Sequence, residues 1–246
     1  MLSESISGFQ DIAVSPIDVQ QILHLRELHQ QEMECQIIQD SFPLRGLSDP
    51  YLARVDGEIA GYGLVANRYY PDTVNEFFMV PEYRGAALPV FRRLLEVSRA
   101  TRIRTQTNDR LLLLMLYDCA ENITPQNVLF ADSLTTLLRC PGGVLRQSDS
   151  KENEEWLIEM DGAAVASGGL LFHYNPPYGD IYMNVEEPYR RRGFGSYLVQ
   201  ELKRICYAMG KIPAARCDAD NVISRKTLEK AGMLPCGRVL QGEVSR

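Results

Sequence analysis

The chain has 246 residues, of which 45% are hydrophobic and 24% are charged. Such values are typical of a globular protein with a substantial core, and this length suits one or two domains. The net charge of −6 argues against nonspecific nucleic-acid binding, so we expect no nucleic-acid partner. The first residues lack a basic start followed by a long apolar run, and we expect neither a signal peptide nor a membrane partner.

The cysteines and histidines point away from disulfide frameworks and metal enzymes. The six cysteines show no Cys-x-x-Cys spacing, which predicts free thiols in a reducing compartment and hence a cytoplasmic protein. His24, His29 and His173 make no metal-ligand pattern, so the sequence predicts no metal site.

The first half of the chain predicts both helices and strands. Ser15 and Pro16 offer an N-cap and a first helical residue, and apolar residues then recur at helical spacing, in a helix that the second half lacks. Residues 51–57 predict a strand that ends in an Asp-Gly turn. Residues 85–100 predict a further helix, and the apolar run 111–116 is too short to span a bilayer and predicts a buried helix.

The second half predicts a regular series of elements. Two strands, at residues 155–160 and 163–173, flank the hairpin signal Asp161-Gly162. Strand, helix, strand, helix and strand then follow in order, at residues 180–185, 196–209, 214–221, 224–233 and 238–244.

A turn that is basic and then glycine-rich joins the strand at 180–185 to the next helix. Gly193 and Gly195 have no Cβ atom, so the backbone there can turn tightly and approach a ligand closely. The N–H groups that open the helix point at such a ligand, and the helix dipole favours an anion. The arginines at 190–192 add positive charge. The pattern matches neither the P-loop nor the dinucleotide fingerprint, and it predicts a cradle for a pyrophosphate.

This turn, with its strand and helix, resembles the acetyl-CoA loop of the GNAT N-acetyltransferase superfamily. The elements between residues 155 and 246 follow the order of that superfamily's core, and Gly232 and Met233 fit the end of its last helix. The resemblance implies acetyl-CoA as co-substrate, acetyl transfer to a primary amine, and pantetheine contacts from the strand backbone. The cofactor-binding residues that it implies are Asn184, Val185, Arg190, Arg191, Arg192, Gly193, Phe194, Gly195, Ser196, Asn221 and Ser224.

The first half of the chain also repeats the second half in a faded form. Residues 51–57 align with residues 156–162, and Tyr83-Arg84 aligns with Tyr189-Arg190. A repeat of this length indicates two related domains, which we place at residues 1–140 and 141–246. The predicted fold class is α/β (α+β), with two GNAT-like domains, each a central mixed, mostly antiparallel sheet flanked by helices.

The two copies differ where the cofactor would bind. Ala87 and Pro89 stand at the positions of Gly193 and Gly195. A proline has no N–H for a phosphate and an alanine adds a Cβ atom. We therefore expect the N-terminal copy to be degenerate, with the cofactor bound by the C-terminal copy alone.

Direct attack of an amine on a thioester needs a base for the ammonium and an acid for the thiolate. Asp180 begins the central strand and is the first candidate for the base, with Glu187 or its neighbour Glu186, and His173, as alternatives. The usual acid is missing, because Leu228 stands where the resemblance implies a tyrosine.

Three hypotheses about function remain at this stage. The first is an N-acetyltransferase, and the second is a non-catalytic acyl-CoA-binding sensor or interaction protein, which Leu228 and the altered first copy motivate. The third, a nucleotide-binding protein, is disfavoured because the Lys-Ser/Thr of a P-loop is missing. The acceptor, a small-molecule or peptide amine, stays open, as does the choice between monomer and homodimer.

Overall fold

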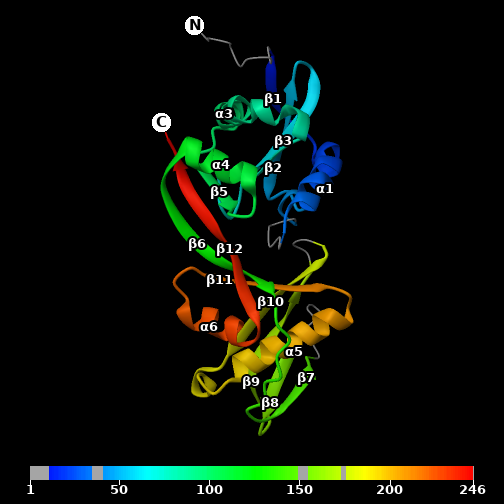
Figure 1. Ribbon diagram of the computed structural model, residues 1–246, viewed down its shortest axis with the longest axis vertical. Helices are drawn as coiled ribbons and strands as arrows, with labels where there is room; N and C mark the ends of the chain where they lie inside the picture. Colours follow the sequence, from blue (N-terminus) through cyan, green and yellow to red (C-terminus); the bar gives the residue numbers. More distant parts are fainter. Residues whose placement is uncertain (1–10, 35–40, 149–154, 173–175, 246) are drawn as a thin grey trace. The chain divides into compact units, whose positions relative to one another are not determined.

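A computed structural model describes residues 11–34, 41–148, 155–172 and 176–245 (Figure 1). The chain forms two compact units. The first unit comprises Met1–Met33, Ser41–Thr124 and Val239–Arg246, and the second comprises Glu34–Asp40 and Pro125–Arg238. The chain passes from the first unit to the second within β6 (Ala120–Asp132) and returns within β12 (Met233–Val244). The sequence predicts a boundary between two repeated copies near residue 140. That boundary divides the sequence repeat rather than these units, and it stays a prediction.

The sheet of the first unit has the strand order β1-β2-β3-β4-β5-β12. Only β4 and β5 run parallel among these neighbours. The strands before β12 are β1 (Ile12–Pro16), β2 (Ser48–Val55), β3 (Glu58–Ala66), β4 (Thr73–Met79) and β5 (Arg102–Gln106). The helices are η1 (Val19–Ile22), α1 (Leu23–Glu32), α2 (Ser41–Leu44), η2 (Pro81–Ala86), α3 (Ala87–Ser98) and α4 (Arg110–Cys119).

Apolar residues on both faces of this sheet are buried. Helices α3 and α4 pack on one face, where Phe77 of β4 lies against Phe91 of α3. Helix α1 packs on the other face, where Leu25 contacts the cluster that includes Tyr62 and Phe78. The alternation of Phe77 and Phe78 between two cores follows from the two-residue period of a strand.

The predicted helix start at Ser15 and Pro16 is wrong. Both residues lie in β1, where they pair with Leu52 and Tyr51 of β2. The helical turn begins later, because the side chain of Asp18 accepts a hydrogen bond from the Gln20 N–H at 2.8 Å and caps η1. A serine followed by a proline also fits an edge strand such as β1. A proline is tolerated there because it has no N–H to donate to a neighbouring strand.

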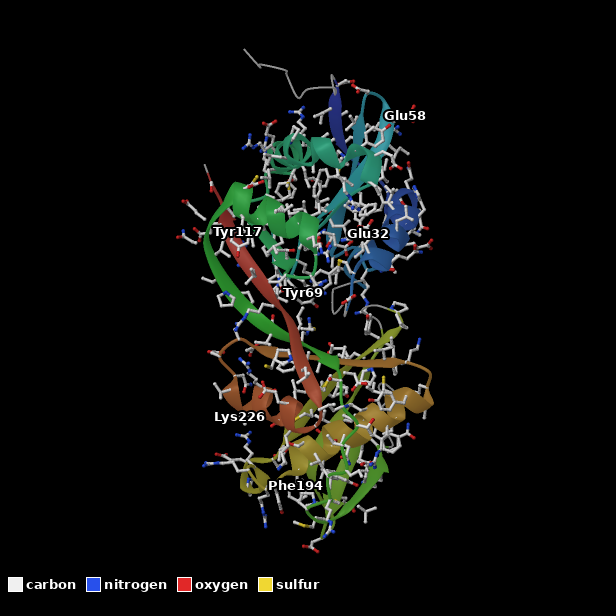
Figure 2. The ribbon with its side chains drawn as sticks, viewed as in Figure 1. Glu32, Glu58, Tyr69, Tyr117, Phe194 and Lys226 are labelled. Carbon is white, nitrogen blue, oxygen red and sulfur yellow. The ribbon has the colours of Figure 1, made fainter. Side chains whose placement is uncertain are left out.

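The sheet of the second unit has the order β6-β11-β10-β9-β8-β7. Only β10 and β11 are parallel among the described neighbours. The strands other than β6 are β7 (Val144–Gln147), β8 (Glu155–Met160), β9 (Ala163–Leu171), β10 (Tyr178–Val185) and β11 (Ile212–Asp218). The helices are η3 (Glu187–Tyr189), α5 (Phe194–Ala208) and α6 (Val222–Lys230). Helix α5 lies across β9 and β10 and buries Leu198, Val199 and Leu202 (Figures 1 and 2).

The two sheets repeat one design, as the sequence repeat predicts. The β2–β3 and β8–β9 hairpins both turn at Asp-Gly, with positive φ at Asp56 and Gly57 and at Asp161 and Gly162. Two consecutive residues with positive φ are the mark of the type I′ turn that joins twisted strands. The predicted hairpins are thus confirmed in both copies.

The two units differ in the connection that follows their first strand. Residues 17–47 connect β1 to β2 and contain η1, α1 and α2, whereas the shorter segment 148–154 connects β7 to β8. One strand of each unit also comes from the other half of the sequence. Residues Val239–Glu243 of β12 pair with β5 of the first unit, and residues Asn127–Ala131 of β6 pair with β11 of the second.

Among the described residues, none of the helices has the length and apolar character that crossing a bilayer requires.

Candidate functional site

Strands β10 and β11 of the second unit separate along their length. Their parallel pairing begins at Tyr178 with Ile212, and its last residue pair is Ile181 with Ala215. β10 then continues to Val185 against β9, while β11 continues against β6. Diverging strands leave backbone groups without ladder partners. The edge of β10 after Ile181 is therefore open to an extended ligand.

The backbone groups that face this opening follow from strand alternation. The Ile212 N–H donates to the Pro177 carbonyl oxygen on the β11 side, whereas the Glu186 N–H donates to Val165 on the β9 side. Because N–H and C=O groups alternate sides along a strand, Met183 and Val185 face the opening. The backbone of Asn184 faces β9 instead. Met183 was missed at the sequence level, since nothing in its side chain marks its backbone.

The predicted pyrophosphate turn has an unusual backbone. Arg191 has a φ of 61° and Gly193 a φ of 95°, so two left-handed residues stand just before α5. Helical hydrogen bonding begins with the Tyr197 N–H, which donates to the Gly193 carbonyl oxygen at 3.1 Å. In the part of the chain that the structure describes, the N–H groups from Arg191 to Ser196 have no backbone acceptor. Such a run of N–H groups at a helix start is an anion-binding nest.

The three arginines of this turn have different roles. Arg190 is tied to the strand, because its Nε donates to the Val185 carbonyl oxygen at 3.0 Å. Arg192 is exposed, and its guanidinium lies over the ring of Tyr189 at 5.6 Å. Arg191 is exposed as well. Arg191 and Arg192 therefore present exposed positive charge beside the nest, while Arg190 holds the turn in shape.

The two glycines are needed for different reasons. Gly193 has a positive φ, and a Cβ there would make only an ordinary contact with Pro141, at 3.5 Å. Gly195 is buried, and a Cβ there would lie 3.1 Å from Thr227 Cγ2 and 3.4 Å from Val185 Cγ2. Gly195 thus serves the packing of α5 against α6 and β10, and its role in close approach of a ligand stays a prediction. Phe194 and Ser196 are also buried in this packing, so their backbone N–H groups alone face the turn.

Asn221 and Ser224 form the N-cap of α6. The Asn221 side-chain oxygen accepts a hydrogen bond from the Ser224 N–H at 3.0 Å. Such a cap fixes where the helix begins. Binding of the cofactor by these two residues stays a prediction. Because the side-chain oxygen of Asn221 already accepts from Ser224, its amide nitrogen would be the group that contacts the cofactor.

Of the predicted base candidates, Asp180 has the most unusual surroundings. It is only 6% exposed, and its Oδ2 lies 3.7 Å from Arg216 Nε. Its Oδ1 has no hydrogen-bond partner within the described part of the chain. Burial raises the pKa of Asp180 from 3.8 to about 6, and the charge of Arg216 opposes this shift. A carboxyl that is deprotonated only above pH 6 is poised to accept a proton near neutrality.

The other two candidates do not join Asp180. Glu187 is exposed in η3, beyond the far end of β10, and 3.3 Å per strand residue puts it more than about 15 Å away. Glu186 is exposed and accepts a hydrogen bond from the Asn184 side chain at 3.1 Å. His173 lies outside the described residues.

Leu228 is 3% exposed and belongs to the core of the second unit. The position where the resemblance implies a tyrosine is therefore occupied by a packing residue. Tyr182 lies two residues from Asp180, on the same face of β10, and burial raises the pKa of its phenol.

The matching turn of the first unit is built differently. η2 runs directly into α3, and none of its residues has a positive φ. The Ala87 N–H already donates to the Arg84 carbonyl oxygen, and Pro89 has no N–H. Arg84 is paired with Glu32 at 2.5 Å. The first unit thus lacks the nest of free N–H groups that precedes α5.

Comparison with known proteins agrees with this geometry. Residues 126–233 match the family model described as the acetyltransferase (GNAT) family. This range of the second unit therefore resembles a GNAT acetyltransferase domain. The match supports acyltransferase activity in general, and GNAT enzymes generally use acetyl-CoA or another acyl-CoA. No curated protein matches the chain.

Solved structures extend the fold likeness to the whole chain. A GNAT-family acetyltransferase from Colwellia psychrerythraea has a TM-score of 0.76 at 13% identity, with 95% of this chain and 100% of that chain covered. A tandem GNAT protein from the clavulanic acid biosynthesis pathway has a TM-score of 0.64 at 11% identity, covering 96% and 99%. A putative acetyltransferase from Pyrococcus horikoshii has a TM-score of 0.57 at 13% identity, covering 100% and 93%. At these identities the likeness shows the fold alone, and it gives the first unit a GNAT-like fold as well.

Proposed function

We propose that the second unit is an N-acetyltransferase that moves an acetyl group from acetyl-CoA to a primary amine. The observation that carries this proposal is the run of N–H groups from Arg191 to Ser196, next to the open edge of β10. A pyrophosphate and an extended amide-bearing arm need these two features side by side.

The residues present fit acetyl-CoA. The N–H groups before α5 would hold the pyrophosphate, with Arg191 and Arg192 adding charge. The backbone of Met183 and the N–H of Val185 would bond the pantetheine amides, because the Val185 carbonyl oxygen is already bonded to Arg190. The Asn221 amide would meet the same arm from the start of α6.

Acetyl-CoA supplies an activated acetyl thioester. The protein holds it in place, so that the amine reacts within one complex rather than by random encounter. Asp180 accepts the proton of the attacking amine, since its Oδ1 is unbonded and its carboxyl is ionised above pH 6. Leu228 offers no proton to the thiolate, which leaves unassisted because a thiol has an ordinary pKa of about 8.5.

The alternative is a non-catalytic domain that binds acyl-CoA. Leu228 in the core is the observation that favours it, since the implied acid is missing. The nest would be used identically in both cases. The acceptor amine, small molecule or peptide, and a cytoplasmic location stay predictions.

Turnover separates the two functions. The chain would be incubated with acetyl-CoA and a panel of primary amines, amino acids and peptides, and release of the free CoA thiol measured. An acetyltransferase releases thiol only when an acceptor is present, and the acetylated amine is found in equal amount. Saturable acetyl-CoA binding without amine-dependent thiol release would support the binding protein instead.

A further inference from the structure

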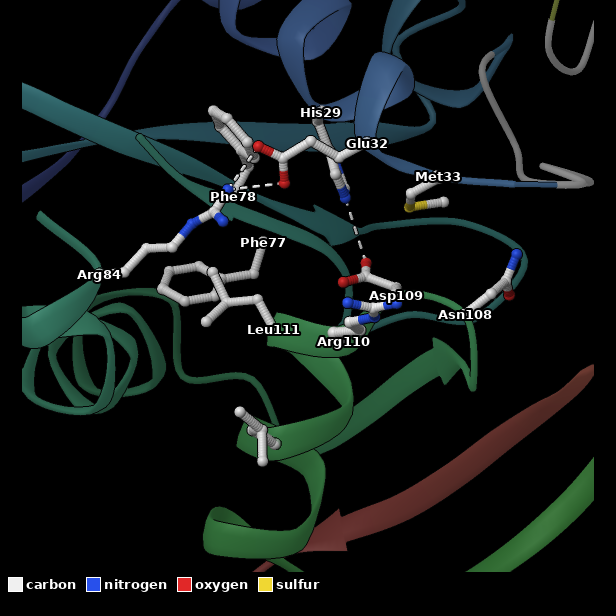
Figure 3. A pocket seen from close by; sticks show the side chains of 11 residues that line it. His29, Glu32, Met33, Phe77, Phe78, Arg84, Asn108, Asp109, Arg110 and Leu111 are labelled. Atoms are coloured by element: carbon white, nitrogen blue, oxygen red, sulfur yellow. Dashed lines mark hydrogen bonds and ion pairs between the residues drawn. The ribbon is translucent and has the colours of Figure 1, made fainter. Parts of the chain in front are cut away.

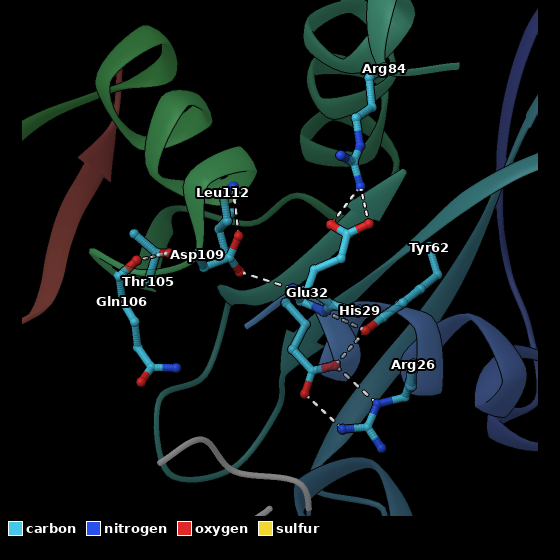
Figure 4. A network of polar contacts seen from close by, with 10 residues as sticks. Arg26, His29, Glu32, Tyr62, Arg84, Thr105, Gln106, Asp109 and Leu112 are labelled. Atoms are coloured by element: carbon cyan, nitrogen blue, oxygen red, sulfur yellow. Dashed lines mark hydrogen bonds and ion pairs between the residues drawn. The ribbon is translucent and has the colours of Figure 1, made fainter. Parts of the chain in front are cut away.

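In the first unit, helix α1 closes the face of the sheet opposite α3 and α4. A buried network, shown in Figure 4, holds it there. Arg26 of α1 donates two hydrogen bonds to Glu76, at 3.0 and 2.9 Å, and the Tyr62 hydroxyl donates a third at 2.9 Å. The Nδ1 of His29, also on α1, lies 2.9 Å from the same hydroxyl. Both oxygens of the buried Glu76 carboxylate are therefore used in packing α1 on the sheet.

The cavity beside this network is balanced in charge. It has a volume of about 490 Å³ and is lined by residues of α1, β4, η2 and α4 (Figure 3). Glu32 pairs with Arg84 across it. Asp109 lies 3.3 Å from the His29 ring and, in Figure 3, beside Arg110. The acids and bases that line the cavity thus match one another, which distinguishes this face from its counterpart in the second unit.

Among its described residues, the second unit has no counterpart of α1. The segment at the same place in the strand order, residues 148–154, is shorter than α1 alone. Helices α5 and α6 both pack in the apolar cluster that contains Ile181. Because alternate residues of a strand point to opposite faces, Asp180 and Tyr182 lie on the other side of the sheet. A ligand of the second unit can therefore lie where α1 lies in the first.

Glu155 of β8 shares this side of the sheet with Tyr182. It pairs with Gly169 of β9, and Gly169 pairs in turn with Tyr182 of β10, so the three residues form one row across the strands. Residues directly opposite each other point to the same side of a sheet. Burial raises the pKa of the Tyr182 phenol, and the nearby charge of Glu155 raises it further. Because Gly169 has no side chain, no side chain of β9 stands between Glu155 and Tyr182.

The carboxylates on this side of the sheet are not balanced. The Nε of Arg216 lies 3.7 Å from Asp180. The Nε of Arg146 lies 2.6 Å from Glu159. Within the described residues, the half-buried carboxylate of Glu155 has no ion-pair or hydrogen-bond partner. A carboxylate that is partly removed from water and lacks a cation favours a cationic ligand.

Asp180 marks the other end of the same region. It is only 6% exposed, and its Oδ1 has no hydrogen-bond partner in the described part of the chain. Buried polar groups normally have such a partner. In the proposed function Asp180 takes the proton of the attacking amine, so the acceptor must approach from the side of the sheet that bears Asp180. An acceptor that reaches Asp180 therefore also comes near Glu155.

Strand geometry sets the spacing between these two carboxylates. Neighbouring strands lie about 4.8 Å apart and each residue advances a strand by about 3.3 Å, so the α-carbons of Asp180 and Glu155 are about 12 Å apart. Because both side chains rise from one side of the sheet, their carboxyl groups have a similar separation. Two charge-assisted hydrogen bonds of about 2.8 Å leave about 6 Å between the two donors. A chain of four methylene groups holds two amino nitrogens about 6 Å apart.

We propose that the acceptor of the second unit is a small aliphatic diamine, whose reacting amino group meets Asp180 and whose second amino group, as an ammonium, meets Glu155. Its methylene chain lies over Gly169, between Leu171 and Tyr182. This inference rests on the proposed function and adds the class of acceptor to it. The reacting nitrogen forms a bond to the acetyl carbon and gives its proton to Asp180, while the C–S bond of the thioester breaks and CoA leaves as the thiolate.

Three amines with one reacting end and different far ends test the acceptor class. They are 1,4-diaminobutane, butylamine and 4-aminobutanoate, whose far ends are cationic, neutral and anionic. Each is titrated calorimetrically into the full chain with excess CoA, which has no acetyl group to transfer, and each is also offered as acceptor with acetyl-CoA. The diamine is expected to bind about tenfold tighter than butylamine, and 4-aminobutanoate is expected to be weakest. Equal affinity of the diamine and butylamine, preference for 4-aminobutanoate, or no binding of any amine would overturn the proposal.

Two substitutions in β8 locate the second ammonium. Glu155→Gln removes the carboxylate at the proposed site, and Glu159→Gln removes one that Arg146 already pairs with. Circular dichroism and thermal unfolding establish that both variants are folded. Glu155→Gln should weaken binding of the diamine about tenfold and leave butylamine within about twofold, whereas Glu159→Gln should preserve the advantage of the diamine. The proposal is overturned if Glu155→Gln keeps that advantage or weakens both amines equally.

Binding and turnover together separate this inference from the proposed function. Selective binding of the diamine without acetyl transfer would retain the diamine site and refute the transferase. Acetyl transfer to all three amines with similar kcat/KM would retain the transferase and refute the diamine site. The absence of both binding and turnover would refute both.

Discussion

The Nε of Arg190 donates to the carbonyl oxygen of Val185 at 3.0 Å, and this bond ties the start of the turn to the end of β10. The first unit has the same bond, from Arg84 to Met79 at 3.1 Å. The arginine is therefore common to the unit with a nest and the unit without one. Its shared role is to shape the turn, so in the proposed function the pyrophosphate would be held by other groups.

Separate replacement of Arg190 and of the pair Arg191 and Arg192 tests whether the first shapes the turn and the other two bind the cofactor. Arg190→Ala removes a hydrogen bond that holds the turn, so the free energy of unfolding should fall by about 1 kcal/mol. The double variant Arg191→Ala/Arg192→Ala should change it by less than about 0.5 kcal/mol per residue, because both side chains are exposed. The double variant should nevertheless weaken acetyl-CoA binding.

Urea unfolding and calorimetry of the same preparations measure both quantities. Arg204→Ala, on the exposed side of α5 and paired with Glu201, is the control for loss of a positive charge. The division of roles would be refuted if Arg190→Ala left the stability unchanged.

Asp180 should make the stability of the protein depend on pH. Burial raises its pKa from 3.8 to about 6, so the fold favours the protonated carboxyl. Its favourable contribution is complete below pH 3.8 and is lost as pH rises through 6. Asp180→Asn removes this dependence, and between pH 4 and pH 7 its stability relative to wild type should rise by about 2–3 kcal/mol. Urea unfolding at several pH values measures the difference, which should be flat if Asp180 has an ordinary pKa.

The same carboxyl sets a pH dependence of activity in the proposed reaction. The base must be ionised, so kcat/KM should rise about tenfold per pH unit below 6 and level off above it. Asp180→Asn should lower the plateau by about 100-fold. A variant that kept wild-type activity with an unchanged pH profile would assign the base to another residue.

Gly168 of β9 lies where the central strand leaves no room for a side chain. A Cβ there would be 2.5 Å from the Tyr182 carbonyl oxygen, and Gly61 meets the Phe78 carbonyl oxygen in the same way. Backbone cannot move aside as a flexible side chain can. Gly168→Ala should therefore lower the free energy of unfolding by about 1–3 kcal/mol. Thermal or urea unfolding checks this, with Ala164→Gly on the exposed part of β9 as a control that should lose less than about 1 kcal/mol.

The parts of the fold that depend on local sequence were predicted correctly. The Asp-Gly hairpins, the strand before the turn and helix α5 follow from residues adjacent in the chain. The return of β12 to the first unit was not foreseen, because strand pairing such as Val239 with Gln106 leaves no local mark. The expected helix start at Ser15 failed for a related reason, since the pairing of β1 with β2 overrides a local cap signal.

The candidate site also has parts that the sequence predicted and parts that it did not. The turn around Gly193 was visible in the sequence because arginines and glycines are adjacent there. The backbone role of Met183 was not visible, because strand alternation and register decide it. The network of His29, Tyr62 and Glu76 was also missed, since it joins residues that are 33 and 14 positions apart.

The most direct test of the account compares two glycines at opposite ends of α5. Gly193 and Gly210 both have positive φ, 95° and 67°, and a Cβ at either meets no close neighbour. Gly193→Ala and Gly210→Ala should each lower stability by about 1–2 kcal/mol. Isothermal titration of acetyl-CoA should show one equivalent bound by wild type and by Gly210→Ala, and affinity at least about tenfold weaker for folded Gly193→Ala. Equal affinity in the two variants, or no binding by wild type, would contradict an acetyl-CoA site at the start of α5.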